Sequence, residues 1–438
     1  MTNRLRQASV PARGLAAAAL VMVLAMTVPV VTGWKVDFAS FHPVIASWSP
    51  RVGPGTVPAL VIGVAGVLVA LDAARFLPWR ALLALTWLTG WAWMLALALV
   101  DGVPGIGNVL DGRYEYLNTA RATTDVPALL QEFVTRIPDG PNSWPVHVAG
   151  HPPGALLFFI LLVRLGLGSG LAAALVVTVV AATTPVAVLV TARALGAELP
   201  ARRALPFLVL GPVAIWQAVS ADALFAAVAA WGVAALALGA TRRSMPWSLL
   251  AGALLGYCAL MSYGLPLLGV LALTVLLVSR SWFALPFALT TAIAVVLVFA
   301  ALGFVWWEAF PVLQDRYWSG LASRRPASYW LWGNIAALLF SAGPLLAAAL
   351  ASAGKEMVAA IRRPSRHVLG ALAAAGVIMV AVADLTLMSK AEVERIWLPF
   401  VPWLMLSCAF LPERWRRGGL ALQVGFAIVA QHLLRTPW

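Results

Sequence analysis

Charged side chains are scarce in this sequence, making up 11% of its 438 residues. An ordinary soluble domain carries about a quarter charged residues, so a soluble globular fold is excluded. Acids are fewer than bases, with 17 Asp and Glu against 30 Lys and Arg. A formal charge of +13 also occurs in nucleic-acid-binding proteins, but this chain has no basic stripe and no RNA-binding motif. We therefore expect no nucleic-acid partner, and we interpret the charge as the positive-inside pattern of a membrane protein.

Cysteine is nearly absent. Cys258 and Cys408 both lie inside apolar segments, and neither belongs to a CxxC pair or a Cys/His cluster of zinc spacing. This excludes a disulfide framework and a thiolate metal site. The sequence also lacks an evident internal repeat, so a transporter built from inverted repeats has no positive support.

Long apolar runs are abundant, and 62% of the residues are hydrophobic. A spanning helix needs about 20 mostly apolar residues. On that measure we expect an all-α polytopic membrane protein with about thirteen transmembrane helices. The predicted segments cover residues 15–34, 56–74, 81–100, 171–192, 204–218, 220–240, 247–262, 265–280, 282–305, 331–353, 368–388, 397–412 and 418–434. The first follows three arginines and resembles a signal sequence, but it is long enough to remain as an uncleaved first helix.

The segments divide the chain into three parts. Residues 1–100 form N-terminal transmembrane helices, residues 101–170 an outer catalytic loop, and residues 171–438 a transmembrane bundle with a second outer loop at 306–330. With a cytoplasmic N-terminus, most arginines fall in short cytoplasmic loops and most acids fall outside. We expect a multi-pass protein of a bacterial plasma membrane with its active site on the extracytoplasmic face.

The outer loop contains two predicted short helices. Val126, Leu129, Leu130 and Phe133 repeat at helical spacing, which predicts a short amphipathic helix on the membrane surface. Residues 154–165 are apolar but too few to span, which predicts a second interfacial or re-entrant helix. The expected outer loop therefore carries interfacial helices.

Asp111 is the first candidate for chemistry. It lies in the outer loop and is followed by Arg113, Tyr114 and Glu115. A carboxylate near a membrane interface can act as a general base on a sugar or lipid hydroxyl. A solvated loop acid is the simpler alternative.

His151 and two aspartates form a second group of candidates. Pro152 and Pro153 hold His151 extended just before the predicted interfacial helix, where an imidazole can bind a phosphate oxygen or relay a proton. The alternative is a proline-rich turn with an incidental histidine. Asp222 lies at the outer end between two apolar helices, where an ionisable group is a functional candidate. Asp384 raises the same question, and we interpret it as helix-packing polarity.

Arginines near the outer face could bind a lipid phosphate. Arg324 and Arg325 lie among aromatic residues of the second outer loop, although those aromatics also fit an interfacial belt. Arg395 precedes the twelfth predicted helix, and a buried guanidinium there suits a phosphate leaving group. The alternative is an ion pair with Glu392 or Glu394 on a wet surface.

Together these motifs resemble the GT-C superfamily of integral-membrane glycosyltransferases, especially its protein O-mannosyltransferase and aminoarabinose transferase branch. That family begins a large outer loop with an acid followed by Arg-Tyr, which is similar to residues 111–114. A surface helix introduced by a basic residue and proline resembles residues 151–154. A spanning helix that ends in arginine resembles Arg193, and a later outer-facing acid resembles Asp222.

The resemblance implies a transferase that uses a polyprenyl-phosphate sugar as donor and a lipid, glycan or protein acceptor. It implies that Asp111 is the base, that His151 binds or positions the donor phosphate, and that Asp222 is a second carboxylate of the site. Arg113 and Tyr114 would bind substrate beside them. The resemblance leaves a divalent metal open, with Asp111 and Asp222 as the ligands it would use.

Arg395, with Arg324 and Arg325 as weaker alternatives, is our own candidate for the departing phosphate. A secondary transporter or a flippase for lipids or glycans is the main alternative function, since many such proteins have a dozen or so helices. A non-catalytic membrane scaffold is a third.

Overall fold

A computed structural model of the protein describes residues 2–36 and 41–437. The described chain is almost entirely helical, and its only sheet pairs β1 (Ser47–Trp48) with β2 (Leu434–Arg435) in antiparallel register. Its many apolar helices confirm an all-α, multi-pass membrane protein.

Seven helices of the described chain are long and apolar enough to cross a membrane. They are α1 (Thr2–Thr32), α2 (Thr56–Phe76), α3 (Trp79–Ala98), α9 (Gly170–Ala181) continued by α10 (Thr184–Ala194), α13 (Ala221–Arg242), α16 (Ala284–Ala301) and α20 (Val368–Leu385). Several other predicted spans are shorter apolar helices, namely α14 (Met245–Met261), α15 (Leu268–Ser279) and α22 (Val401–Met405), the last extended by a 3₁₀ turn. The expected count of about thirteen is therefore not confirmed.

The span predicted at 331–353 is broken. It consists of α18 (Ala327–Ser341) and α19 (Leu345–Arg362), which are bent by 101° relative to each other. The chain turns at Gly343, whose φ of +89° suits glycine. Gln423 hydrogen-bonds to backbone groups on both sides of the break. Its Nε2 donates to the Ala342 carbonyl at 2.7 Å, and its Oε1 accepts from the Leu345 amide at 3.4 Å. Counted as one span, this pair raises the total to eight.

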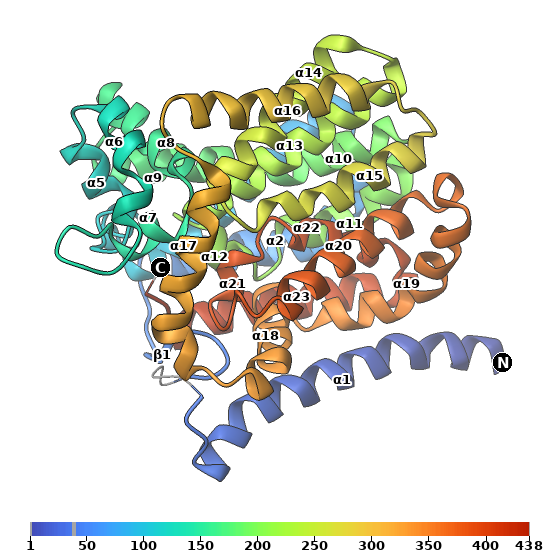
Figure 1. The fold of residues 1–438 in the computed structure, drawn as a ribbon. Helices are drawn as coiled ribbons and strands as arrows, with labels where there is room; N and C mark the ends of the chain where they lie inside the picture. Colours follow the sequence, from blue (N-terminus) through green and yellow to red (C-terminus); the bar gives the residue numbers. More distant parts are fainter. Residues whose placement is uncertain (1, 37–40, 438) are drawn as a thin grey trace.

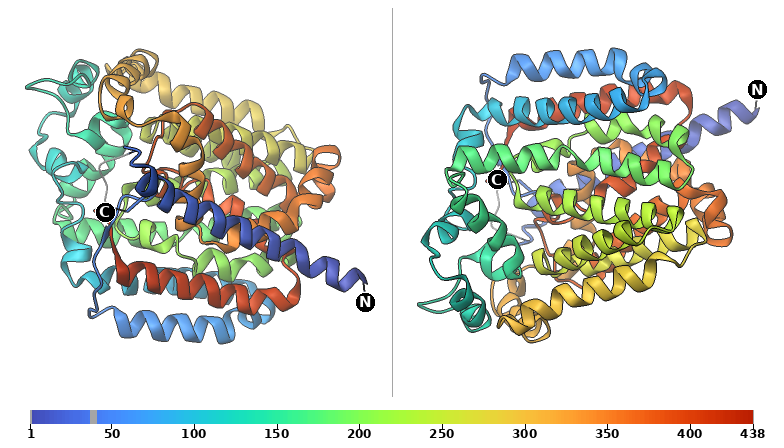
Figure 2. Two further views of the ribbon diagram at one scale, coloured as in Figure 1. Left: turned by 90° about the horizontal axis from the view of Figure 1, so that it is seen from below. Right: turned by 90° about the horizontal axis from the view of Figure 1, so that it is seen from above.

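The long helices run side by side, and short helices of residues 101–170 gather at one end of the bundle (Figure 1). The N-terminus lies at the opposite end, and the two views of Figure 2 agree on this arrangement. The short helices are α4 (Pro104–Gly107), α5 (Tyr116–Ala122), α6 (Val126–Glu132), α7 (Val146–Gly150) and α8 (Pro153–Arg164). The structure thus confirms helices at the two places predicted from the loop sequence, as α6 and α8.

The segment 306–330 is more ordered than a loop. Most of it is α17 (Trp306–Ser319), a helix that the sequence analysis did not predict. Arg316 joins α17 to the short helices, since its Nη2 pairs with Asp139 Oδ1 at 2.8 Å and its Nη1 donates to the Ile137 carbonyl at 2.5 Å. Segments 101–170 and 306–330 are therefore joined at one end of the bundle.

The remaining helices are α11 (Glu198–Val209), α12 (Ala214–Gln217), α21 (Val393–Ile396) and α23 (Glu413–Leu433). The end of α23 reaches the start of the 101–170 segment, where Gln431 Nε2 donates to Asp101 Oδ2 at 2.8 Å. Arg51 pairs with the same carboxylate through its Nε at 2.5 Å. Asp101 thus bonds to residues far from it in sequence, Arg51 and Gln431, at the end of the bundle that carries the short helices.

Candidate functional site

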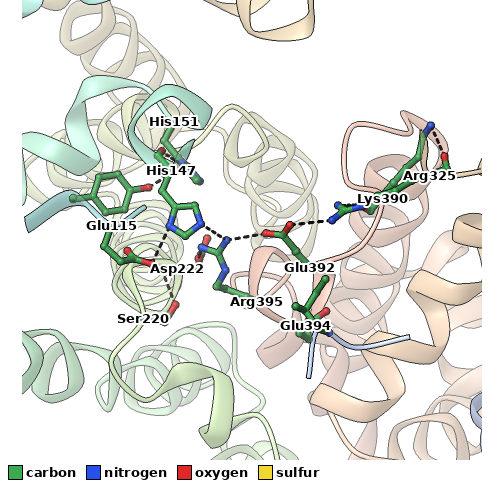
Figure 3. A network of polar contacts seen from close by, with 12 residues as sticks. Glu115, His147, His151, Ser220, Asp222, Arg325, Lys390, Glu392, Glu394 and Arg395 are labelled. Carbon is green, nitrogen blue, oxygen red and sulfur yellow. Dashed lines mark hydrogen bonds and ion pairs between the residues drawn. The ribbon is translucent and has the colours of Figure 1, made fainter. Parts of the chain in front are cut away.

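Four separate elements bring charged side chains together where the short helices meet the long ones. Glu115 directly precedes α5, and His147 lies in α7. Asp222 lies in the first turn of α13, behind the cap residue Ser220, and Arg395 lies in α21. Figure 3 shows these side chains directed toward one another from their separate elements. We call Glu115, His147, Asp222, Glu392 and Arg395 the buried charge cluster.

Arg395 is the centre of the buried charge cluster. Its Nη1 lies 2.7 Å from Asp222 Oδ2, its Nη2 lies 3.2 Å from Glu392 Oε2, and only 5% of its side chain is exposed. Burial alone disfavours the charged guanidinium. Asp222, Glu392 and Glu115 outweigh that cost, so the pKa of Arg395 is raised. Arg395 is therefore a permanent cation among acids.

His147 connects Arg395 to the segment 101–170. Arg395 Nη2 lies 3.3 Å from His147 Nε2, and His147 Nδ1 lies 2.9 Å from Glu115 Oε1. Because a guanidinium can only donate, His147 Nε2 accepts from Arg395. Figure 3 shows the His147 ring between the Arg395 guanidinium and the Glu115 carboxylate. These contacts thus link Glu115 to Arg395 through the His147 ring.

A second histidine lies just behind this chain of contacts. His151 Nδ1 is 2.8 Å from Tyr116 Oη and 2.8 Å from the His147 carbonyl, which can only accept. Desolvation by burial lowers the pKa of His151. Desolvation also raises the pKa of Tyr116, and the negative charges of Asp222 and Glu115 raise it further. His151 is therefore held neutral with its proton on Nδ1.

Glu392 extends the network away from the loop. Burial disfavours its charge, but Arg395, Arg325 and His147 more than compensate and lower the pKa of Glu392. Arg325 Nη2 lies 3.5 Å from Glu392 Oε1, and Arg325 Nη1 donates to the Lys390 carbonyl at 2.6 Å. The segment before α21 is thus fixed by charges on both sides.

The backbone beside the cluster is strained. Val219 has a φ of 59°, three residues before Asp222, and Ala391 and Glu392 have φ of 69° and 63°. Residues other than glycine rarely adopt this left-handed region, and each costs on the order of 1–3 kcal/mol. Such strain persists where the surroundings impose it and often accompanies functional sites.

Glu394 lies beside Arg395 in α21, and its carboxylate hydrogen-bonds to the backbone. It is fully buried, and its Oε1 accepts from the Ile45 amide at 3.0 Å. Desolvation raises the pKa of Glu394 to about 7, against the opposing effect of that hydrogen bond. Glu394 thus titrates near neutral pH.

A small cavity lies beside Asp222. Its volume is about 30 Å³, and its walls include Phe225, Trp397 and Phe400. This volume suits a water molecule rather than a sugar.

The structure brings only some of the predicted site residues together. Asp222 and Arg395 belong to the buried charge cluster, and His151 lies next to it. Asp111 instead pairs with Arg121 at 2.7 Å, with about 38% of its side chain exposed. No hydrogen bond or ion pair among residues 2–36 and 41–437 joins Asp111 to the cluster.

The other predicted binding residues differ in exposure. Arg113 stacks on the exposed Tyr114 ring at 4.5 Å and also donates to its hydroxyl. Arg325 is buried, whereas Arg324 is exposed and has no ion pair within the described part of the chain. Arg395 does pair with Glu392, as the alternative reading held, but it does so in a buried place.

The described residues contain no group of three or more His, Cys, Asp or Glu that could hold a metal ion. Asp222, one of the two residues considered for a metal, pairs with Arg395 instead. The Arg395 guanidinium thus already neutralises the charge of the Asp222 carboxylate.

Sequence reasoning missed the roles of Glu115 and His147. Both stand within four residues of predicted candidates, Glu115 after Asp111 and His147 before His151. The i, i+4 spacing of His147 and His151 places them on one side of a helical turn, which was the available signal.

No family model matches the chain, and no curated protein or solved structure matches it either.

Proposed function

We propose that this multi-pass membrane protein is a glycosyltransferase. It moves a sugar from a polyprenyl-phosphate donor to a lipid, glycan or protein acceptor of the cell envelope. In this proposal the site lies on the extracytoplasmic face of a bacterial plasma membrane. The resemblance of residues 111–114 and 151–154 to GT-C enzymes motivates the reaction class.

The observation that best supports the proposal is the chain of contacts from Glu115 through His147 to Arg395. A general base needs a fixed carboxylate in a place with limited water. Glu115 meets both conditions, since its side chain is 13% exposed and His147 holds one oxygen. Asp111 is more exposed and is paired with Arg121. The geometry therefore favours Glu115 as the base, and Asp111 remains the candidate that the resemblance favours.

The proposed step is a direct displacement. Glu115 takes the proton of the acceptor hydroxyl while that oxygen forms a bond to the anomeric carbon. The bond from the anomeric carbon to the phosphate oxygen breaks, and the polyprenyl phosphate leaves with the electron pair. Attack from the opposite side inverts the anomeric configuration.

Arg395 and His147 act as positioning residues in this scheme. The Nη atoms of Arg395 already contact Asp222, Glu392 and His147, so they are occupied before any phosphate arrives. Cations that are exposed on the outer side, such as Arg324, are better placed to accept the charge of the leaving phosphate.

The test is transfer of radiolabelled sugar from polyprenyl-phosphate donors to a membrane-lipid acceptor extract, by protein in lipid nanodiscs with and without EDTA. We expect Glu115→Gln to lose about 10²- to 10⁴-fold in rate, the usual contribution of a general base. Glu132→Gln is the matched control, because Glu132 is an exposed acid of α6 in the same outer segment. The unfolding midpoint of each variant shows that lost activity does not reflect lost structure.

The remaining outcomes separate the alternatives. Loss of transfer in Asp111→Asn with retention in Glu115→Gln would move the base to Asp111 and keep the reaction class. If the wild type transferred no label but moved labelled lipid or sugar across proteoliposomes, the protein would be a transporter or flippase.

A further inference from the structure

A large pocket lies far from the buried charge cluster. Its volume is about 640 Å³, within the range of about 300–1,000 Å³ that is usual for ligand pockets. Trp79, Arg80, Arg193, Arg242 and Trp247 contribute its polar and aromatic walls. We call it the basic pocket.

The basic pocket and the cluster lie at opposite ends of α13. Asp222 is in the first turn of that helix and Arg242 is in the last. The helix has 22 residues, which corresponds to about 33 Å at the usual rise, close to the thickness of a bilayer core. The basic pocket therefore lies at the other membrane face, where clustered arginines mark the cytoplasmic side.

The charges of the basic pocket are only partly compensated. Arg193 pairs with Glu198 at 3.2 Å, and its guanidinium stacks on Trp79 at 4.2 Å. Arg80 and Arg242 are exposed, and neither has an acidic partner among the residues that the structure describes. Two arginines thus line one pocket with no anion to balance them.

The remaining walls are apolar. Val190, Ala194 and Leu238 lie beside the arginines. Arginine binds phosphate oxygens in a bidentate manner, and tryptophan is favoured at the level of lipid headgroups. A pocket with both features between helices at the cytoplasmic face is suited to a phosphodiester whose glycerol carries acyl chains.

We propose that the basic pocket binds the phosphate headgroup of an anionic phospholipid from the cytoplasmic leaflet. Arg80 and Arg242 contact the phosphate, Arg193 lies on Trp79 at the rim, and the apolar wall receives the first carbons of the lipid. The proposal does not depend on the reaction proposed for the opposite face.

The test uses the full chain in nanodiscs of phosphatidylcholine with phosphatidylglycerol or cardiolipin as one fifth of the lipid. The protein is then extracted into mild detergent, and retained lipids are counted by native mass spectrometry. We expect Arg80→Gln combined with Arg242→Gln to reduce retained anionic lipid at least fivefold. These two substitutions leave the contacts of Arg193 with Glu198 and Trp79 unchanged, so we expect the variant to fold.

The matched control is Arg362→Gln combined with Arg363→Gln, which removes two exposed arginines at the end of α19, outside the basic pocket. Arg80→Lys combined with Arg242→Lys should keep part of the retention, because charge remains while the bidentate geometry is lost. Equal retention in the pocket variant and the wild type would overturn the proposal. Displacement of the lipid by millimolar inorganic phosphate would also overturn it, because the pocket would then be a site for a soluble anion.

Discussion

Arg395 Nη1 lies 2.7 Å from Asp222 Oδ2, although 173 positions separate the two residues in the chain. Both side chains are about 5% exposed. An ion pair that is formed by the start of α13 and the short helix α21 joins the middle of the chain to its last quarter. Because desolvation opposes both charges, each depends on the other to remain in place.

Arg395→Gln should strongly destabilise the protein. Removing one partner of a buried ion pair leaves an uncompensated charge and costs about 3–5 kcal/mol. Here Asp222 and Glu392 would both lose their cation. The measurement is the denaturant unfolding midpoint in detergent, followed by tryptophan fluorescence. Adding Asp222→Asn to Arg395→Gln should recover part of the loss, and Arg324→Gln, at an exposed site, should change little. A midpoint unchanged by Arg395→Gln would contradict this account.

Glu394 should make the protein less stable as pH rises through neutrality. Burial raises the pKa of Glu394 to about 7 from its ordinary value of 4.5, so the folded state holds the proton more tightly than the unfolded state. The stabilisation is complete below about pH 4.5 and is lost as pH rises through about 7. A shift of this size corresponds to about 3 kcal/mol.

Glu394→Gln tests this prediction, because glutamine keeps an oxygen for the Ile45 amide but cannot ionise. We expect the unfolding free energy of the variant to depend less on pH between 5 and 8 than that of the wild type. Parallel pH profiles for the two proteins would rule out Glu394 as the source.

The sequence predicted the presence of helices better than it predicted the contacts between distant residues. Helical spacing of apolar residues was sufficient for α6, and the run after His151-Pro152-Pro153 was sufficient for α8. The break at Gly343 was missed, because the apolar run continues across it and the compensating Gln423 lies in a distant helix. Glu115 and His147 were missed as partners for the same reason, since Arg395, which orders them, is remote in sequence.

Asn334 fixes the chain between α20 and α21. Its Nδ2 donates to Asp384 Oδ1 and to the Ser389 carbonyl, both at 2.8 Å, and its Oδ1 accepts from the Ala391 amide at 3.1 Å. Asp384 thus packs against a polar partner, in line with the structural role expected for it. Because each buried group left unpaired costs about 1–3 kcal/mol, Asn334→Ala should lower the unfolding free energy by several kcal/mol. Asn142→Ala, at an exposed position, is the control, and equal midpoints for the two variants would refute the assignment.

Glycines decide how closely α14 and α16 approach each other. A Cβ added at Gly252 would lie 2.3 Å from the Ala288 carbonyl oxygen, and one at Gly256 would lie 2.8 Å from Ala292 Cα. The two glycines are four residues apart and form a small-residue face of the kind that lets membrane helices pack closely. Adding a methyl group at either place must push the helix backbones apart.

Gly252→Ala and Gly256→Ala should therefore each destabilise the protein by about 1–3 kcal/mol, the usual cost of overpacking. Gly425→Ala, in α23, should have the opposite sign, because an added Cβ there meets nothing within 4 Å. Alanine in an unobstructed helix interior is favoured over glycine by about 0.5–1 kcal/mol, so this variant should be slightly more stable. The unfolding midpoints of the three variants in one detergent make the comparison. If all three variants were more stable than the wild type, helix propensity would outweigh close packing at these glycines, and the packing account would be wrong.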